Sequence, residues 1–333
     1  MSKSIPYILT VFLFVSFGCN HNTESFDGPS LVDRFGEFDL VAALEVSQPT
    51  VDFEAGETVY FTAQFNKNVD WVVVITGMES GAVKRIEGFD KEVGQENAIW
   101  DGGTTDLPFF KAEMCTVELV VPEEPDFLNI GEVTSLSTKT YNGSLFADWE
   151  EDPGVNVEAG NYEFELTPNS GRQNNIPAAQ GEYYYLLEGT DNVVPNFFVG
   201  LANVSSKIAG ETYASLPTTV PENLYFNCFL YSDGGPHGIA VIQFVFDSND
   251  SGAFEDGSDL TFQVAGDFPL NWEGWQLISH PMSETGMTQE QLEKLVAIRL
   301  ILISDMNSQP ADPLQVKFGA DFLTFTEGGP LEL

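Results

Sequence analysis

The chain has 333 residues, enough for one large or two medium domains. Its 51 acidic residues outnumber 13 basic ones and give a net charge of −38. Because phosphate binding needs Lys and Arg, this charge excludes nucleic acid as a partner and disfavours adsorption to anionic lipid headgroups. The apolar fraction of 43% is sufficient for a substantial buried core.

Residues 1–18 have the features of an export signal. Lys3 supplies a positive charge, and Ile8–Phe17 form an apolar stretch that is too short to span a bilayer. The stretch ends in Val-Ser-Phe-Gly-Cys19, which resembles the lipobox of bacterial lipoproteins and implies that Cys19 carries a lipid. The alternative is an ordinary signal peptide with an incidental cysteine. In the lipoprotein interpretation, residues 19–36 are a polar tether, and the lipid anchor is the only contact with the membrane.

Residues 37–122 predict a first β-sandwich. Val59–Phe65 alternates between apolar and polar positions, Trp71–Ile75 is a continuous apolar run, and Met114–Val121 closes the segment. Within it, Ala98-Ile-Trp-Asp-Gly-Gly103 resembles the immunoglobulin-like module of flagellar hook-capping proteins, with Trp100 expected in the core. Residues 123–131 are expected to be a linker, because Pro122-Glu-Glu-Pro-Asp126 cannot pair in a sheet.

Residues 132–333 predict a larger, second all-β domain. About ten apolar runs of strand length fall in this region, which favours a jelly-roll β-sandwich. One short helix is expected where Thr288 can cap the chain and Gln291 follows three residues later.

The loop after the strand Ile239–Phe246 is rich in oxygen-bearing side chains. Asp247, Asn249 and Ser251 occupy alternate positions, and Gly252 follows where a calcium-binding loop needs a sharp turn. This spacing predicts a structural calcium site, and a solvated acidic hairpin is the alternative. The expected ligands are Asp247, Asn249, Ser251, Glu255, Asp256 and Asp259.

Several short motifs of the second domain are similar to carbohydrate-binding modules of the galactose-binding-like jelly-roll type. They are Leu145–Glu150, Gly274–Ile278 with Pro281, Ile298–Ile303 and Phe318–Phe325. Together with the lipobox and the first domain, the chain resembles surface glycan-binding lipoproteins of Bacteroidota polysaccharide-utilisation systems. The resemblance implies a surface-exposed location on the outer membrane and a polysaccharide or oligosaccharide ligand. It also implies a second, weaker calcium site between the first and last strands, formed by Asp148, Glu150 and Asp321.

Sugar rings stack on flat aromatic faces, so the aromatic side chains of the second domain are candidate contacts. The candidate sugar-stacking residues are Trp272, Tyr183, Tyr185 and Trp149. The sequence has no nucleophile elbow, metalloprotease helix or phosphate loop. We therefore expect a non-catalytic carbohydrate-binding protein. The alternatives are a structural or adhesive component that binds other outer-membrane proteins, and, ranked last, a polysaccharide lyase or hydrolase.

Overall fold

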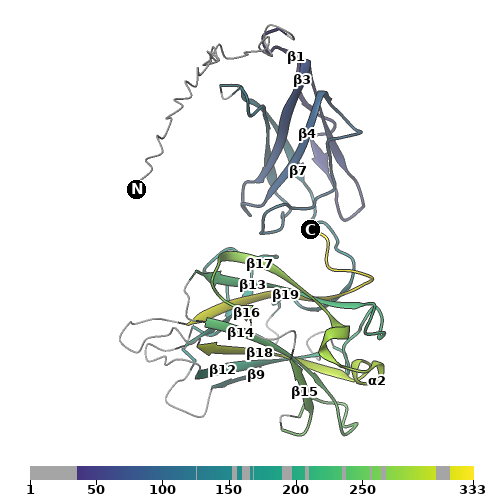
Figure 1. Cartoon of the computed structure of the whole chain (residues 1–333), viewed down its shortest axis with the longest axis vertical. Coiled ribbons are helices and arrows are strands. Elements are labelled where there is room, and N and C mark those ends of the chain that lie inside the picture. Colours follow the sequence, from purple (N-terminus) through teal and green to yellow (C-terminus); the bar gives the residue numbers. More distant parts are fainter. Residues whose placement is uncertain are drawn as a thin grey trace, which may run out of the picture.

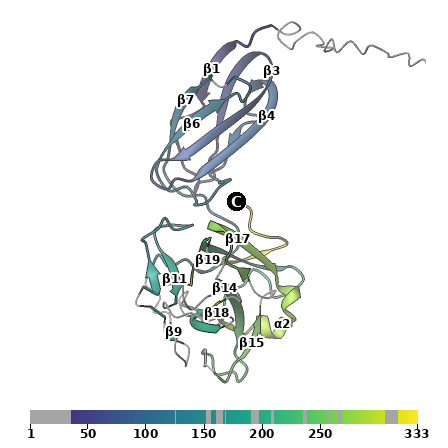
Figure 2. The same cartoon turned by 60° about the vertical axis from the view of Figure 1, so that its left-hand side comes forward.

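The computed structural model describes residues 36–124, 126–151, 156–159, 166–167, 169–189, 197–206, 210–234, 238–255, 257–263, 268–304 and 316–333. They form two β-domains, one above the other, and the C-terminus lies between them (Figures 1 and 2). The predicted all-β fold is confirmed. Cys19 and the rest of residues 1–35 are outside the described residues. No helix in the described part is long and apolar enough to cross a bilayer.

The N-terminal domain is built around one long strand, β3 (Val59–Gly77). Buried and more exposed residues alternate along nearly all of it, which is the period of a strand with one face on a core. The main sheet has the order β1 (Leu40–Val46), β3, β6 (Met114–Val120), β7 (Asn129–Ser135) and β2 (Thr50–Val51), and both β4 (Val83–Val93) and β5 (Ile99–Trp100) also pair with β3.

The predicted boundary between the domains is wrong by about ten residues. Strand β7 pairs with β6 from Met114↔Thr134 to Leu119↔Asn129, so it belongs to the first sheet. Pro122 lies in the connection between these two strands. The expected linker at 123–131 therefore contains the start of a strand, and the first domain ends after Ser135.

The side chain of Trp100 lies in the core of the first domain, as predicted. The rings of Phe53 and Phe110 pack edge-on against it, each with a centroid 4.7 Å away. Its Nε1 donates to the carbonyl of Gly103 at 2.9 Å, so the turn that follows Trp100 satisfies the one polar atom of the buried ring. The immunoglobulin-like character of this domain stays a prediction.

The C-terminal domain is a jelly-roll sandwich of two antiparallel sheets. One, called the β13–β19 sheet, has the order β10 (Gly171–Gln173), β11 (Tyr184–Glu188), β19 (Lys317–Glu327), β13 (Leu224–Asp233) and β17 (Glu273–Pro281), and β8 (Ser144–Ala147) pairs with β19. The other, called the β14–β18 sheet, has the order β15 (Leu260–Gln263), β14 (Gly238–Phe246), β18 (Leu295–Ser304), β12 (Phe197–Ser205) and β9 (Asn156–Ala159), and β16 (Phe268–Pro269) pairs with β14. Between the sheets lies a core of aliphatic and aromatic side chains that includes Phe226, Phe244 and Phe325.

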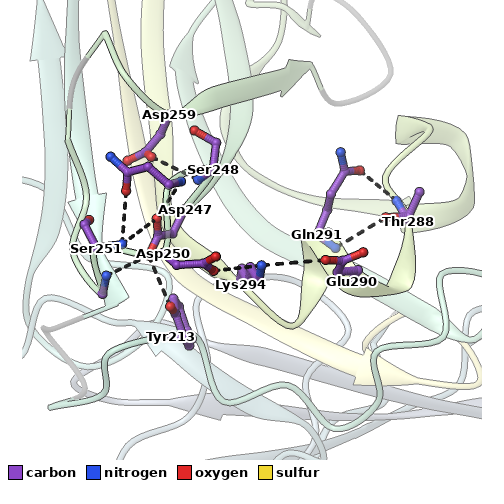
Figure 3. Close-up of polar contacts among 12 residues, drawn as sticks. Tyr213, Asp247, Ser248, Asp250, Ser251, Asp259, Thr288, Glu290, Gln291 and Lys294 are labelled. Atoms are coloured by element: carbon purple, nitrogen blue, oxygen red, sulfur yellow. Dashed lines mark hydrogen bonds and ion pairs between the residues drawn. The ribbon is translucent and has the colours of Figure 1, made fainter.

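The predicted helix is confirmed as the single turn α2 (Gln289–Leu292), which follows the 3₁₀ turn η2 (Met282–Thr285). Thr288 accepts a hydrogen bond from the backbone N–H of Gln291, and the Gln291 side chain accepts one from the N–H of Thr288 (Figure 3). This reciprocal pair is the capping box expected from the sequence.

The two domains touch through the loop that precedes β6. The ring of Phe109 in this loop stacks on Tyr141 at 4.1 Å and meets Phe229 of the sandwich edge-on at 5.1 Å. Its N–H donates to the carbonyl of Ala179 at 2.8 Å. Leu331, near the C-terminus, is part of the same apolar cluster. Phe109 is therefore a side chain of the first domain that is buried against the second.

Candidate functional site

The acidic loop after β14 is closed by its own hydrogen bonds (Figure 3). Asp247 is fully buried, and its Oδ1 accepts from the backbone N–H groups of Asn249 and Ser251 at 3.2 and 3.1 Å. Its Oδ2 accepts from the N–H of Gly252 at 2.7 Å and from the hydroxyl of Tyr213 at 3.1 Å. Burial tends to raise the pKa of Asp247, but these donors outweigh it and hold the pKa below its ordinary value.

Asp259 and Asp250, two other acidic residues of this loop, are also paired. Asp259 accepts from the N–H groups of Ser248 and Glu255 at 3.2 and 2.7 Å, and Asp250 forms an ion pair with Lys294 at 2.8 Å. Among the described residues, which do not include Asp256, no three His, Cys, Asp or Glu side chains are grouped to hold a metal. Calcium at Asp247, Asn249, Ser251, Glu255 and Asp259 stays a prediction. The backbone donors and Lys294 offset the repulsion among these carboxylates.

The residues of the weaker predicted calcium site lie near one another. Strand β8 pairs with β19 at Ala147↔Leu323, which brings Asp148 and Glu150 toward Asp321. The three described carboxylates are not grouped to hold a metal, and Glu150 Oε1 accepts from the N–H groups of Glu182 and Tyr183 at 2.9 and 3.1 Å. Asp321 is fully buried and accepts from the N–H groups of Gln180 at 2.9 Å and Phe322 at 2.7 Å. Burial raises its pKa well above the ordinary value, the two donors offset this only in part, and the negative charges of Glu150 and Asp148 raise it further.

Two of the four predicted sugar-stacking residues are wrong. Trp149 is 1% exposed and Tyr185 is 3% exposed, and their rings pack against each other in the core at 5.7 Å. Tyr185 lies at an inward-facing position of β11, and the left-handed backbone of Trp149 (φ 60°) follows β8 into the core. Large aromatic rings at these positions fill the sandwich and present no face to a ligand.

The other two aromatic residues are half-buried and do not share a surface platform. The guanidinium of Arg172 lies 3.3 Å from the centroid of the Tyr183 ring and covers that face. Trp272 packs partly on the core, and its Nε1 donates to the carbonyl of Gly274 at 3.0 Å. The four predicted residues therefore do not assemble into one binding surface.

Sequence reasoning missed a polar row that crosses the β14–β18 sheet. The register places Gln263 opposite Gln243, Gln243 opposite Arg299, Arg299 opposite Asn203, and Asn203 opposite Asn156. Each of the five strands β15, β14, β18, β12 and β9 thus contributes one residue. We call these five positions the polar row. The signal is present in the sequence, because Gln243, Arg299 and Asn203 each interrupt a long apolar strand.

The polar row is bordered by apolar side chains on the face of the sheet that points away from the core. On one side lie Leu201, Val241 and Ile301, and the rings of Tyr213 and Phe254 pack near Val245 and Ala297 on the other. The aliphatic side chains of these borders are themselves buried. The half-exposed apolar side chains beside the row are Phe198, Ile239 and Ile303 on one side and Tyr213 and Phe254 on the other.

The polar row contains an unfilled hydrogen-bond donor. Asn203 is 2% exposed, and its Oδ1 accepts from the Nε of Arg299 at 2.8 Å. Its Nδ2 has no hydrogen-bond partner in the described part of the chain. Leaving a buried amide donor unpaired is costly, so such groups call for an explanation. Gln243 and Arg299, on the same row, are half-exposed.

Comparison with solved structures gives similar folds among carbohydrate-binding proteins. One is a carbohydrate-binding module of the β-sandwich superfamily, with 10% identity and a TM-score of 0.38 over 87% of this chain and 98% of that one. A family 11 module from Clostridium thermocellum, in complex with a β-1,3-1,4-mixed-linked tetrasaccharide, has 13% identity and a TM-score of 0.37 over 59% of this chain and 100% of that one. SGBP-B from a xyloglucan utilization locus of Bacteroides uniformis has 16% identity and a TM-score of 0.35 over 86% of this chain and 74% of that one.

No protein-family model matches the chain, and no curated protein matches its sequence. Identities of 10–16% with TM-scores below 0.4 do not carry a ligand from those proteins to this chain. Its function has to be argued from its own residues.

Proposed function

We propose that the chain is a non-catalytic carbohydrate-binding protein, and that its ligand lies along the polar row of the β14–β18 sheet. The observation that carries this proposal is the row itself, with the open donor of Asn203 and the half-exposed side chains of Gln243 and Arg299. Amide and guanidinium groups offer paired donors and acceptors of the kind that vicinal sugar hydroxyls can use. The half-exposed side chains of Phe198, Ile239 and Ile303 on one side of the row, and of Tyr213 and Phe254 on the other, offer apolar surface to the C–H faces of sugar rings.

The shape of the polar row fits an extended oligosaccharide. Neighbouring strands are about 4.8 Å apart, so a row across five strands spans about 19 Å. A ligand lying along it crosses the strands at right angles and meets the described side chains of Gln243, Arg299 and Asn203. The net charge of −38 repels polyanions, so we expect a neutral glycan and not a polyuronate.

A non-catalytic role is supported by the carboxyl groups. Glycoside hydrolysis requires an acid of raised pKa placed at the scissile bond. Asp321, a carboxyl whose pKa burial raises, lies fully buried in β19 of the opposite sheet. It cannot reach a polymer that lies on the β14–β18 sheet.

The same proposal includes an envelope location. The lipobox-like sequence ending at Cys19 supports a lipid-anchored, surface-exposed protein of the outer membrane. In the alternative, the chain is a structural or adhesive component, and the β14–β18 sheet packs on another outer-membrane protein. The variant Cys19→Ala tests whether Cys19 carries the lipid anchor. We expect the variant to be absent from the membrane fraction, and its retention there at wild-type levels would exclude the anchor.

Calcium is proposed as a structural ion beside Asp321. Its support is the cost of a fully buried carboxylate that has two N–H donors and two acidic neighbours, Glu150 and Asp148. A divalent cation bound there would neutralise this charge in the folded state. Asp247, whose oxygens already accept four hydrogen bonds, has less need of an ion.

The test of the function uses soluble chain and a panel of neutral and acidic polysaccharides in affinity gels and on a glycan array. Gln243→Ala should weaken binding of a neutral glycan about tenfold, the effect of one lost hydrogen bond to a ligand. Gln276→Ala is the matched control, because Gln276 is an exposed glutamine on β17 of the other sheet. Full affinity in the Gln243 variant would exclude the row as the site.

Two other outcomes exclude the proposal as a whole. The appearance of new reducing ends on incubation with the bound polysaccharide would show an enzyme. Silence across the whole panel, with capture of a purified outer-membrane protein that Gln243→Ala weakens, would favour the adhesive alternative.

A further inference from the structure

A cavity lies where the two domains meet. Its volume is about 310 Å³, at the small end of the range for ligand sites. Phe109 and Glu54 reach it from the first domain, Tyr141 from the connection after β7, and Gln180 and Phe322 from the sandwich. We call it the interdomain cavity. It is on the side of the β13–β19 sheet, across the sandwich from the polar row.

The apolar wall of the interdomain cavity consists of aromatic rings held in fixed positions. Tyr141 stacks on Phe109 with an angle of 14° between the rings, and Phe322 meets both rings edge-on at 6.2 and 5.7 Å. The backbone of Phe322 is left-handed (φ 47°), an uncommon conformation for a bulky residue, and the N–H to Asp321 hydrogen bond stabilises it. Such a wall is pre-organised for flat C–H surfaces.

Two polar atoms at the interdomain cavity lack partners. Within the described residues, the Oη of Tyr141 and the Oε1 of Gln180 are buried and accept or donate no hydrogen bond. Both residues line the cavity. The amide oxygen of Gln180 requires a donor, and the Tyr141 hydroxyl takes either a donor or an acceptor. Both atoms are covered in this structure, so a ligand hydroxyl group satisfies both demands once the two side chains turn toward the cavity.

The charges around the cavity disfavour an anion. Lys139 lines the wall, but its ammonium forms an ion pair with Asp101 at 2.7 Å. Glu54 and Asp148 also contribute to the lining. The cationic charge is thus already neutralised, and acidic groups remain.

From these four features we infer that the interdomain cavity binds one neutral sugar residue, as a free monosaccharide or as the end of a glycan chain. This site is independent of the polar row and extends the proposed function to a second place on the molecule. Because its walls come from both domains, an occupied cavity stabilises their contact by mass action.

The test is titration of the full chain with neutral hexoses and pentoses and their methyl glycosides, followed by calorimetry and saturation-transfer NMR, in calcium and in EDTA. Tyr141→Phe removes the Oη and keeps the ring. Gln180→Met removes the amide and keeps the backbone N–H that binds Asp321. Each variant should weaken the best monosaccharide about tenfold, which corresponds to about 1.4 kcal/mol. Gln276→Ala should bind like the wild type.

Stability separates a ligand-binding role from a structural one. An unpartnered buried hydroxyl contributes nothing to the folded state, so Tyr141→Phe should unfold at the same or a higher temperature than the wild type. A large drop in unfolding temperature together with weaker binding would show that the hydroxyl is structural, and the inference would fall.

Some outcomes exclude sugar binding in the interdomain cavity and leave the polar row as a possible site. One outcome excludes the polar row and supports the cavity. Absence of saturable monosaccharide binding by the wild-type chain means that the cavity holds only water. Binding that Gln243→Ala weakens and Tyr141→Phe does not would assign the monosaccharide to the polar row. Loss of the calcium response in Gln180→Met, with sugar binding intact, would assign Oε1 to the ion. Conversely, Tyr141-dependent monosaccharide binding without any polysaccharide binding would support this cavity and exclude the polar row.

Discussion

Replacing Phe109 by Ala should uncouple the two domains. Phe109 is 5% exposed and packs on Tyr141, Phe229 and Phe322. None of these three residues belongs to the sheet of the first domain. Removal of a buried Phe side chain costs about 3–5 kcal/mol, and here the loss falls on the contact between domains. The first domain has about 100 residues, for which about 3 kcal/mol corresponds to roughly 12 °C or more in unfolding temperature.

Phe110 provides the control because it is adjacent, buried and aromatic, and its ring belongs to the core of the first domain even though it also lines the interdomain cavity. Its ring packs on Trp100 at 4.7 Å inside the first domain. Phe110→Ala should destabilise that domain by a similar amount and leave the arrangement of the two domains unchanged. The two substitutions therefore differ in where the energy is lost and not in the size of the side chain removed.

Scanning calorimetry and small-angle scattering measure the two effects. The wild type should unfold with coupled domains and give one narrow distribution of interdomain distances. Phe109→Ala should separate the transitions, broaden that distribution and expose the connection at 136–143 to proteases. The reasoning is refuted if Phe109→Ala keeps the wild-type scattering curve and unfolding profile, or if Phe110→Ala separates the domains as strongly.

Two smaller predictions concern single side chains. Thr288→Ala removes the capping box of α2 and should cost about 1 kcal/mol in urea unfolding, with Thr288→Ser close to the wild type; equal losses in both would show that the hydroxyl is not what matters. Burial tends to raise the pKa of Glu113, but the Ser80 hydroxyl and three backbone N–H groups hold it below its ordinary value of 4.5. Its charge therefore stabilises the fold above pH 4.5, and this stability is lost as the pH falls through the lowered pKa. Glu113→Gln should flatten the loss of urea stability between about pH 5 and 3, and an unchanged slope would contradict this.

The all-β fold and the capped helix could be predicted because both depend on local patterns. Alternation along Val59–Phe65 and the Thr288–Gln291 spacing each specify a structure without knowledge of distant residues. The domain boundary could not be predicted in this way. A Pro-rich acidic segment is equally compatible with a linker and with a tight connection inside one sheet, and only the pairing of β6 with β7 decides between them.

The candidate site was harder to predict because it depends on strand register. The polar row requires that β15, β14, β18, β12 and β9 be neighbours in that order, and they are far apart in sequence. Aromatic residues gave a misleading signal, because Trp149 and Tyr185 are as suitable for a core as for a sugar platform. A single Gln, Arg or Asn in an apolar strand is the more specific signal, since burying such a group is costly unless it has a partner or a ligand.

The calcium proposal leads to the last prediction, in which two carboxylates are compared. Asp321 is fully buried with two N–H donors and two acidic neighbours, whereas Asp247 accepts four hydrogen bonds from its own loop and from Tyr213. An ion that binds only the folded state stabilises it by about 2.7 kcal/mol at a hundredfold excess over the dissociation constant.

We therefore expect EDTA to lower the unfolding temperature by several degrees, calcium to restore it, and magnesium to restore it poorly because it demands tighter octahedral geometry. Asp321→Asn, which removes the charge and keeps the shape, should abolish the response and raise stability in EDTA, since the buried charge is gone. Asp247→Asn should keep the calcium response and lose stability at all calcium concentrations, since a neutral amide accepts these hydrogen bonds less strongly. If the response instead disappears in Asp247→Asn and persists in Asp321→Asn, the ion belongs to the acidic loop, and four hydrogen bonds to a carboxylate do not exclude it from binding calcium.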